Sequence, residues 1–546
     1  MDAKPTKDKS NKNSFPFISK LKNLDSFKLK LTIKEDKIFL FIALVYIIFH
    51  LTTTAISLWP FTTDDAYITM RYSKNWADGH GITWNTGDST PVEGYSNFSY
   101  LLLGRLGIEL INDPILFIKI VGILSLCIGL IAMYWLLRLS ASRIFSIIPV
   151  IIFTIYPGGI FWAVSGLETA LYFCLTVSIA LLFFYSLGFR PVSTETVKAP
   201  PRKPINLLSL AICGFLIFIS GITRPEGPGV GIALGIALFI DAFNQRKTKG
   251  FFRPFLLTSL SFFLPFIICY GSYFLWRFSY FGKLLPNSIY CKTGYLEKPF
   301  ILIHRFIILG FPLIIGLLLT LRKFFRPKFA SLIFFILLNC SLYYQADPII
   351  SHFNRHMLVS FATLLVITFW SLSEFSKRHS IYALILSMLI FFSYFILYNP
   401  WFVKKHFADT VVGYGHREFV RFEIGKWLNK HSKEGEWYML GDAGVIPYST
   451  KKLNVYDCYC LNSNEMTGSE INKDGKKYAK FILNKQPAFI IITSKKPNKM
   501  IFRSPIYKYL FEDSRMKDNY NYIKMFEADE KFNYFIFEHK NHSSEG

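Results

Sequence analysis

Residues 38–58 read IFLFIALVYIIFHLTTTAISL, and this stretch decides the class of the fold. The run meets the ~20-residue length that an α-helix needs to cross a hydrocarbon layer of ~30 Å. Residues 1–37 before it are mostly polar, and no small-residue cleavage pattern follows it. We therefore expect the run to remain in the chain as the first membrane span, and not to be removed as a signal peptide.

The composition of the whole chain indicates further spans. Of the 546 residues, 52% are hydrophobic and 18% are charged, whereas an ordinary soluble domain has ~25% charged residues. Ten more apolar segments are predicted to cross, at residues 114–137, 143–164, 166–189, 205–222, 226–243, 254–276, 300–321, 329–345, 356–374 and 381–398. The sequence thus predicts a polytopic α-helical membrane domain over residues 38–398, with about 11 transmembrane helices.

The net charge of +24 is distributed in a way that predicts the orientation of these spans. Basic residues cluster in the N-terminal tail and in short segments at span ends, such as RPVSTETVKAPPRKP from Arg190 and RKFFRPK from Arg322. Such clusters fix the cytoplasmic side of a membrane protein, so nucleic-acid binding is not needed to explain them. We expect the protein to lie in a bacterial cytoplasmic membrane, with residues 1–37 as a cytoplasmic tail. The first outer loop, residues 59–113, and the C-terminal tail then lie on the periplasmic side.

The C-terminal tail, residues 399–546, differs in composition from the spans. EWYMLGDAGVIPYST from Glu436 and PAFIIITS from Pro487 are typical of strands, and HREFVRFEIGKWLNKH from His416 is typical of a helix. About 145 residues of this kind can bury a core of their own. We predict a C-terminal α/β extracytoplasmic domain, and an interfacial helix over residues 98–111 in the first outer loop.

Two adjacent acids, Asp64 and Asp65, begin the polar part of that loop. One explanation is that an aspartate caps a helix from Ala66 to Asp78 that Gly79 closes. The other explanation is a catalytic role, and it depends on the residues that follow.

The loop continues to Tyr100 as DDAYITMRYSKNWADGHGITWNTGDSTPVEGYSNFSY. The order Asp-Asp-Ala-aromatic-Ile, Arg-Tyr, Gly-x-Gly-x-x-Trp-Asn and Val-Glu-Gly-Tyr-Ser-Asn resembles the first extracytoplasmic loop of a bacterial family of GT-C membrane glycosyltransferases. That family includes the terminal arabinofuranosyltransferases of mycobacterial cell-wall arabinan. Further motifs match it in order along the chain, namely SGLETALY at Ser165, TRPEG at Thr223, PNSIYCK at Pro286, GDAGVIPYST at Gly441 and NVYDCYCLN at Asn454.

The resemblance implies a sugar donor on polyprenyl phosphate and a cell-envelope glycan or glycolipid acceptor. Sugar transfer needs a base for the acceptor hydroxyl proton and cations for the leaving phosphate. We expect Asp64 to be the base, with Asp65 capping the helix, positioning the acceptor or touching a divalent metal ion. Glu93 is the second candidate catalytic carboxylate, or else it forms a salt bridge that orders the loop. No third metal ligand stands at a diagnostic spacing.

Cations at the predicted outer ends of spans are candidates for binding the donor phosphate, because arginine offers a fork and lysine a compact charge. They are Arg224, Lys292, Arg355, His352 and His356. Lipid head-group anchoring or pairing with an acid, such as Glu226 beside Arg224, is the alternative. Glu168 lies at the mouth of a span, where an acid needs a partner, so it either pairs with one of these cations or belongs to the site.

Residues in the matching motifs that we expect to position substrate are Arg71, Tyr72, Trp84, Asn85, Tyr95 and Glu168. Sugars stack on aromatic rings, although interfacial aromatic belts place the same residues in such loops.

Three other functions fit part of the sequence. A transporter or flippase would favour broken helices in repeated halves and would not need the acid pair. A non-catalytic membrane scaffold would tolerate loss of both acids. A protein O-glycosyltransferase would share the chemistry and differ in its acceptor.

Overall fold

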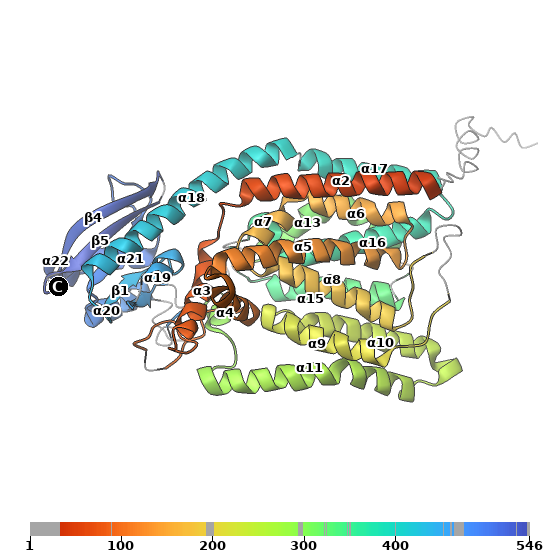
Figure 1. Cartoon of the computed structure of the whole chain (residues 1–546), viewed down its shortest axis with the longest axis horizontal. Coiled ribbons are helices and arrows are strands. Elements are labelled where there is room, and N and C mark those ends of the chain that lie inside the picture. The colour runs from red at the N-terminus through yellow and green to blue at the C-terminus, as the bar shows by residue number, and fades with distance from the viewer. Residues whose placement is uncertain are drawn as a thin grey trace, which may run out of the picture.

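The computed structural model describes residues 33–88, 90–192, 201–292, 299–320, 323, 325–346, 348, 351–398, 400–450, 452–458, 461–463, 474–530 and 532–542. A long bundle of helices forms one part of the molecule, and a small sheet domain lies at one end of it (Figure 1). We call the end of the bundle that faces the sheet domain the domain-side end.

The bundle contains all the segments that the sequence predicted to span. Its helices are α2 (Ile33–Leu58), α5 (Pro114–Arg138), α6 (Arg143–Ile155), α7 (Pro157–Val164), α8 (Thr169–Ser186), α9 (Leu207–Thr223), α10 (Pro228–Lys249), α11 (Phe252–Phe281), α13 (Ile301–Gly310), α14 (Ile314–Thr320), α15 (Pro327–Tyr343), α16 (Leu358–Phe375) and α17 (Ser380–Leu397). Short 3-10 turns, η1 (Phe311–Leu313) and η3 (His352–Met357), lead into α14 and α16. Within the described residues, eight spans are long and apolar enough to cross a membrane, and the bent pair α6 and α7 makes a ninth. The helices α9 and α15 are apolar but shorter.

The bend between α6 and α7 measures 58° and has a local cause. Pro157 is the first residue of α7, and Tyr156 before it is extended at φ −65° and ψ 119°. A residue that precedes proline is pushed out of the helical region, so the segment predicted as one span forms two helices.

The burial of the helices shows which of them lie at the centre. In α16, 89% of the apolar window is buried, against 11% in both α2 and α11. The helices α2 and α11 run along opposite sides of the bundle (Figure 1). Their exposed apolar faces are typical of helices that face lipid.

Two shorter helices lie between the bundle and the sheet domain (Figure 1). They are α3 (Asp64–Ala77) and α4 (Phe98–Ile111). Both come from the predicted first outer loop, and α4 has the bounds expected for the interfacial helix. A further short helix, α12 (Asn287–Lys292), follows α11.

A 32-residue helix, α18 (Pro400–His431), leads from the bundle to the C-terminal domain. That domain has a five-stranded sheet in the order β2-β1-β3-β5-β4. Its strands are β1 (Trp437–Leu440), β2 (Asn454–Asp457), β3 (Phe489–Ser494), β4 (Tyr520–Asp529) and β5 (Phe532–His539), and its other helices are α19 (Val445–Ser449), α20 (Gly475–Lys485), α21 (Pro505–Glu512) and α22 (Ser514–Asn519). The strands β1, β2 and β3 are parallel, and β5 pairs antiparallel with both β3 and β4.

The predicted strand from Glu436 is shorter than expected. Only Trp437–Leu440 pairs in the sheet, and the chain then turns into α19. Pro447 in this segment cannot donate a ladder hydrogen bond, and the glycines of Gly441–Gly444 favour a turn. This turn brings the motif GDAG against the first outer loop.

Candidate active site

The acid pair lies in the first turn of α3, but neither acid caps that helix. The helix begins at Asp64, two residues before the predicted start, and its N-cap is Thr63, with φ −77° and ψ 136°. The capping explanation is therefore wrong for Asp64 and for Asp65. Both acids still lie at the positive end of the helix, where the dipole favours negative charge.

Asp64 reaches across to the C-terminal domain. Its carboxylate accepts hydrogen bonds from the backbone N–H groups of Gly444 at 3.1 Å and Val445 at 3.0 Å. An Nη atom of Arg421 lies 3.6 Å from the same carboxylate. Burial raises the pKa of Asp64 to about 6, against the opposing charge of Arg421 and with a further increase from Asp442. A partly exposed carboxylate with such a pKa is suited to act as a general base near neutral pH.

Arg421 joins Asp64 to two further polar side chains. It contacts the carboxylate of Asp442 at 2.9 Å, and its Nε donates to the Tyr534 hydroxyl at 2.8 Å. The Tyr534 hydroxyl donates in turn to Asp442. These three residues were not among the predicted site residues, and only Asp442 lies in a motif that the sequence singled out.

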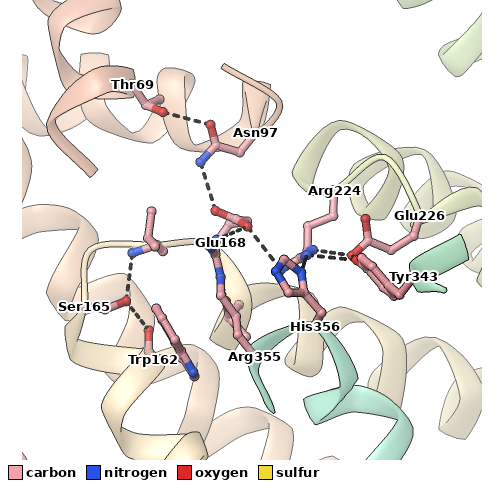
Figure 2. Close-up of polar contacts among 12 residues, drawn as sticks. Thr69, Asn97, Trp162, Ser165, Glu168, Arg224, Glu226, Tyr343, Arg355 and His356 are labelled. Atoms are coloured by element: carbon pink, nitrogen blue, oxygen red, sulfur yellow. Dashed lines mark hydrogen bonds and ion pairs between the residues drawn. The ribbon is translucent and has the colours of Figure 1, made fainter. Parts of the chain in front are cut away.

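A second polar cluster surrounds Glu168, at the N-cap of α8 (Figure 2). Its carboxylate lies 2.7 Å from Arg355 and 3.3 Å from Arg224, and it accepts from the Asn97 amide at 3.0 Å. Burial raises the pKa of Glu168, but the two guanidinium groups outweigh this effect and hold the pKa below its ordinary value. Glu168 is therefore an ionised, paired acid.

Arg224 is fully engaged within this cluster. Its Nε pairs with Glu226, and one Nη contacts the Tyr343 hydroxyl at 3.0 Å and the His356 ring at 3.2 Å. Figure 2 shows Arg224 between Glu226 and His356, with its other Nη directed to Glu168. The structure thus brings together Glu168 and Arg224, which lie in two separate motifs, with Arg355 and His356, which were predicted as cations at the outer end of a span.

Arg355 has an Nη group that can donate to a ligand. Its Nε donates to the Thr169 hydroxyl at 3.0 Å, and Nη2 donates to Glu168. Among the described residues no acceptor is recorded for Nη1, and 11% of the side chain is exposed. Of the two arginines in the cluster, Arg355 is the better candidate for binding an anionic ligand.

The Glu168 cluster and the acid pair lie close together because the turn at 165–168 packs on the start of α3. The Thr63 N–H donates to the Ser165 carbonyl at 2.9 Å. Gly166 has φ +82°, and a Cβ there would lie 2.9 Å from that of Ala66. Asn97 makes a second connection, since it accepts from the Thr69 hydroxyl of α3 and donates to Glu168 (Figure 2).

Two predicted cations are not in this cluster. His352 is exposed and lines a separate pocket of about 410 Å³ with Arg305 and Asn354. Lys292 ends α12, and its side chain lies outside the described part of the chain.

Glu93 forms a salt bridge. Both of its carboxylate oxygens accept from Nε of Arg277, at 2.9 and 2.8 Å, and both side chains are buried. The Glu93 carbonyl also accepts from the N–H of Asn287. This geometry matches the loop-ordering alternative for Glu93. Arg277, a charged residue near the end of an apolar span, was not among the predicted site residues.

Arg71 and Asn85 dock the loop onto the C-terminal domain. Arg71 donates to the carbonyls of Trp84 and Leu453, each at 2.8 Å, and its guanidinium stacks 4.9 Å from the Trp84 ring centre. Asn85 pairs with the backbone of Val455 on the edge strand β2, donating at 3.1 Å and accepting at 2.9 Å. Both side chains are buried.

Tyr72 and Tyr95 are also buried, and they pack edge to face with ring centres 4.9 Å apart. The Tyr72 hydroxyl donates to the Val92 carbonyl at 2.9 Å. Buried side chains can position substrate only through the shape of the loop that they hold. This applies to Arg71, Tyr72, Trp84, Asn85 and Tyr95.

No group of three or more His, Cys, Asp or Glu side chains that could hold a metal ion occurs among the described residues. The metal role of Asp65 stays a prediction.

Comparison with known proteins shows that the fold of this chain is similar to folds already solved. A family model described as a domain of unknown function, DUF8728, matches residues 410–540. No curated protein matches the chain. Among solved structures, ArnT from Cupriavidus metallidurans bound to undecaprenyl phosphate is similar, with a TM-score of 0.54 and 10% sequence identity over 90% of this chain and 97% of that chain.

A second similar structure is the archaeal oligosaccharyltransferase AglB from Archaeoglobus fulgidus, in complex with an inhibitory peptide and a dolichol-phosphate. It has a TM-score of 0.54 and 11% identity over 90% of this chain and 74% of that chain. The apo state of the Cupriavidus ArnT gives a TM-score of 0.53 at 11% identity, over 90% and 98%. At these identities the likeness shows the fold alone, so the resemblance to the arabinofuranosyltransferases stays a prediction. The predicted fold class is confirmed: the chain is a multi-pass membrane protein with the GT-C fold and a C-terminal domain built on a small sheet.

Proposed function

We propose that this protein is a membrane glycosyltransferase that moves a sugar from a polyprenyl-phosphate donor to a glycan or glycolipid of the cell envelope. The observation that carries the proposal is the Asp64 carboxylate, whose pKa burial raises to about 6, on a helix that hydrogen bonds connect to the Arg355–Glu168 cluster through Asn97. A transporter or a scaffold would not need a carboxylate with a pKa raised in this way. Two of the solved structures named above carry a lipid phosphate, undecaprenyl phosphate in ArnT and a dolichol-phosphate in AglB, and this supports the donor class.

In the proposed reaction, the acceptor hydroxyl oxygen attacks the anomeric carbon of the donor sugar. The bond from that carbon to the phosphate oxygen breaks, and polyprenyl phosphate leaves with the electron pair. Asp64 takes the hydroxyl proton, and Nη1 of Arg355 donates to the leaving phosphate. A single displacement of this kind inverts the anomeric centre. Asp65 positions the acceptor.

We place this chemistry on the extracytoplasmic face of a bacterial cytoplasmic membrane. The basic clusters at the opposite ends of the spans favour this orientation. Cys291, which packs against the core of the C-terminal domain, is disulfide-bonded, and disulfides persist in oxidising compartments.

The test is sugar transfer from a panel of radiolabelled polyprenyl-phosphate sugars, in membranes that contain equal amounts of each variant. We expect wild type to consume one donor and Asp64→Asn to lose roughly 10²- to 10⁴-fold in rate, as is typical for removal of a general base. Asp78→Asn is the matched control, because Asp78 is an exposed acid at the other end of α3. Transfer by Asp64→Asn at the wild-type rate would exclude Asp64 as the base. Failure of wild type to use any donor would refute the proposed function.

A further inference from the structure

Two helices bring the membrane domain and the C-terminal domain into contact through paired polar side chains. On α18, Glu418 and Arg421 are three residues apart and so lie on one face. They contact Tyr67 and Asp64, which are also three residues apart, on α3. The base proposed above is therefore supplied by one domain and contacted by the other.

The turn before α19 fits closely around Asp64. The N–H groups of Gly444 and Val445 each bind one carboxylate oxygen of Asp64. A Cβ at Gly444 would overlap both the Asp64 carbonyl and its carboxylate. The absence of a side chain at residue 444 thus lets the turn hold the orientation of Asp64.

Arg421 lies between two carboxylates of similar exposure. Its own side chain is 8% exposed, whereas Asp64 is 18% and Asp442 is 19% exposed. The guanidinium contacts both acids, and the Tyr534 hydroxyl donates to the second one. Each acid keeps an exposed part, while the cation that links them is buried.

The charged and titratable groups that face Asp64 come from four elements. They are Asp65 of α3, Arg421 of α18, Asp442 of the turn after β1, and Tyr534 of β5. Arg421 favours the ionised form of Asp64, and the two aspartates oppose it. Two of the three charges belong to the C-terminal domain.

We propose that Arg421 and Asp442 are positioning residues of the active site, which orient the Asp64 carboxylate and set the pH above which it accepts a proton. This inference rests on the proposed function, because it assigns Asp64 as the base. It gives the C-terminal domain a part in the chemistry, beyond that of a lid or of a module that holds a glycan.

The first test is the pH dependence of transfer. The transfer rate should rise with pH as Asp64 becomes ionised. Arg421→Gln removes the charge that favours ionised Asp64, so we expect the midpoint of this rise to move to higher pH by ~1 pH unit. Asp442→Asn removes an opposing charge, and we expect the rise to move to lower pH. Arg417→Gln is the matched control, since Arg417 lies one turn earlier on α18 and pairs with Asp529; its pH profile should equal that of wild type.

Opposite shifts in Arg421→Gln and Asp442→Asn, with none in Arg417→Gln, would support the proposal, because a merely structural role would lower activity without moving the profile. Unmoved profiles in both variants would overturn it. Should Arg421→Gln not fold, the shift in Asp442→Asn decides alone.

A second readout needs no activity and separates this inference from the proposed function. Thermal unfolding is compared between wild type and Asp64→Asn across pH. The folded pKa of about 6 exceeds the ordinary 3.8, so the folded protein binds more protons between these values. The stability of wild type relative to Asp64→Asn should therefore fall as pH rises through that window and level off above it.

In the Arg421→Gln background the fall should extend to higher pH, and in Asp442→Asn it should end at lower pH. If the two windows shift in this way but the protein transfers no sugar, the influence of Arg421 and Asp442 on Asp64 is supported and the proposed enzyme function is refuted. An unchanged window in a protein that does transfer sugar would refute the control and leave the enzyme standing.

Discussion

Glu168 is the acid that links two arginines at the domain-side end of the bundle. It is 7% exposed and contacts both Arg224 and Arg355. Because it neutralises part of the charge of two buried guanidinium groups, its removal leaves cations without a full set of partners.

We expect Glu168→Gln to lower the free energy of unfolding by about 3–5 kcal/mol, the range for a broken buried ion pair. Unfolding in detergent, followed by tryptophan fluorescence, is the measurement. Glu109→Gln is the control: this acid pairs with Arg105 on α4 and is 52% exposed, so its loss should cost less than about 1 kcal/mol. Equal losses in the two variants would show that the Glu168 pairs are not the stabilising contacts.

The site residues divide into those that the sequence could nominate and those that it could not. Asp64, Glu168 and Arg224 lie in motifs, and Arg355 lies at the predicted outer end of a span, where a charged side chain is costly unless it is paired or functional. Arg421 is more than 350 residues from Asp64 in the chain, and nothing in the helical pattern around it distinguishes it from Arg417. Only the folded contact shows which of the two arginines faces the acid.

Among the elements, the spans were the most predictable part, because a long apolar run leaves few alternatives to a membrane helix. The interruption at Pro157 and the turn after β1 were not predicted. Both depend on single prolines or glycines inside segments whose composition otherwise indicates one continuous element. The contact between α3 and α19 follows from that turn.

This contact leads to a prediction for Gly444. A Cβ at this position overlaps Asp64, so Gly444→Ala should displace the carboxylate and reduce transfer by at least ~10-fold, as expected when a catalytic group moves by ~1 Å. Gly415→Ala is the control, because a Cβ there meets no atom within 4 Å and alanine favours a helix. Transfer rates at matched expression provide the measurement, and full activity of Gly444→Ala would show that the turn does not need to fit closely around Asp64.

The whole molecule is arranged in three layers, with α3 and α4 between the bundle and the sheet domain (Figure 1). Arg71 and Asn85 fasten this middle layer to β2 and to the segment before it. The layer arrangement was not predictable, because nothing in the sequence indicates which face of the C-terminal domain meets the loop.

The proposed topology leads to a labelling prediction. Cysteine at Asn541, an exposed residue of the C-terminal domain, should react with a membrane-impermeant maleimide in intact cells. Lys247→Cys, at an exposed position in the last turn of α10, should react only after the cells are made permeable. If Lys247→Cys reacts in intact cells and Asn541→Cys reacts only in permeable cells, the orientation is the opposite of the proposed one and the site faces the cytoplasm.

The carboxylate of Asp64 and the N–H groups that bind it come from segments about 380 residues apart. The two segments therefore have to change together during divergence. An exchange of the C-terminal domain with that of a related protein should give an active chimera only when residues 64–100 are exchanged with it, and a library that varies one segment alone will lose active members wherever the two surfaces no longer match.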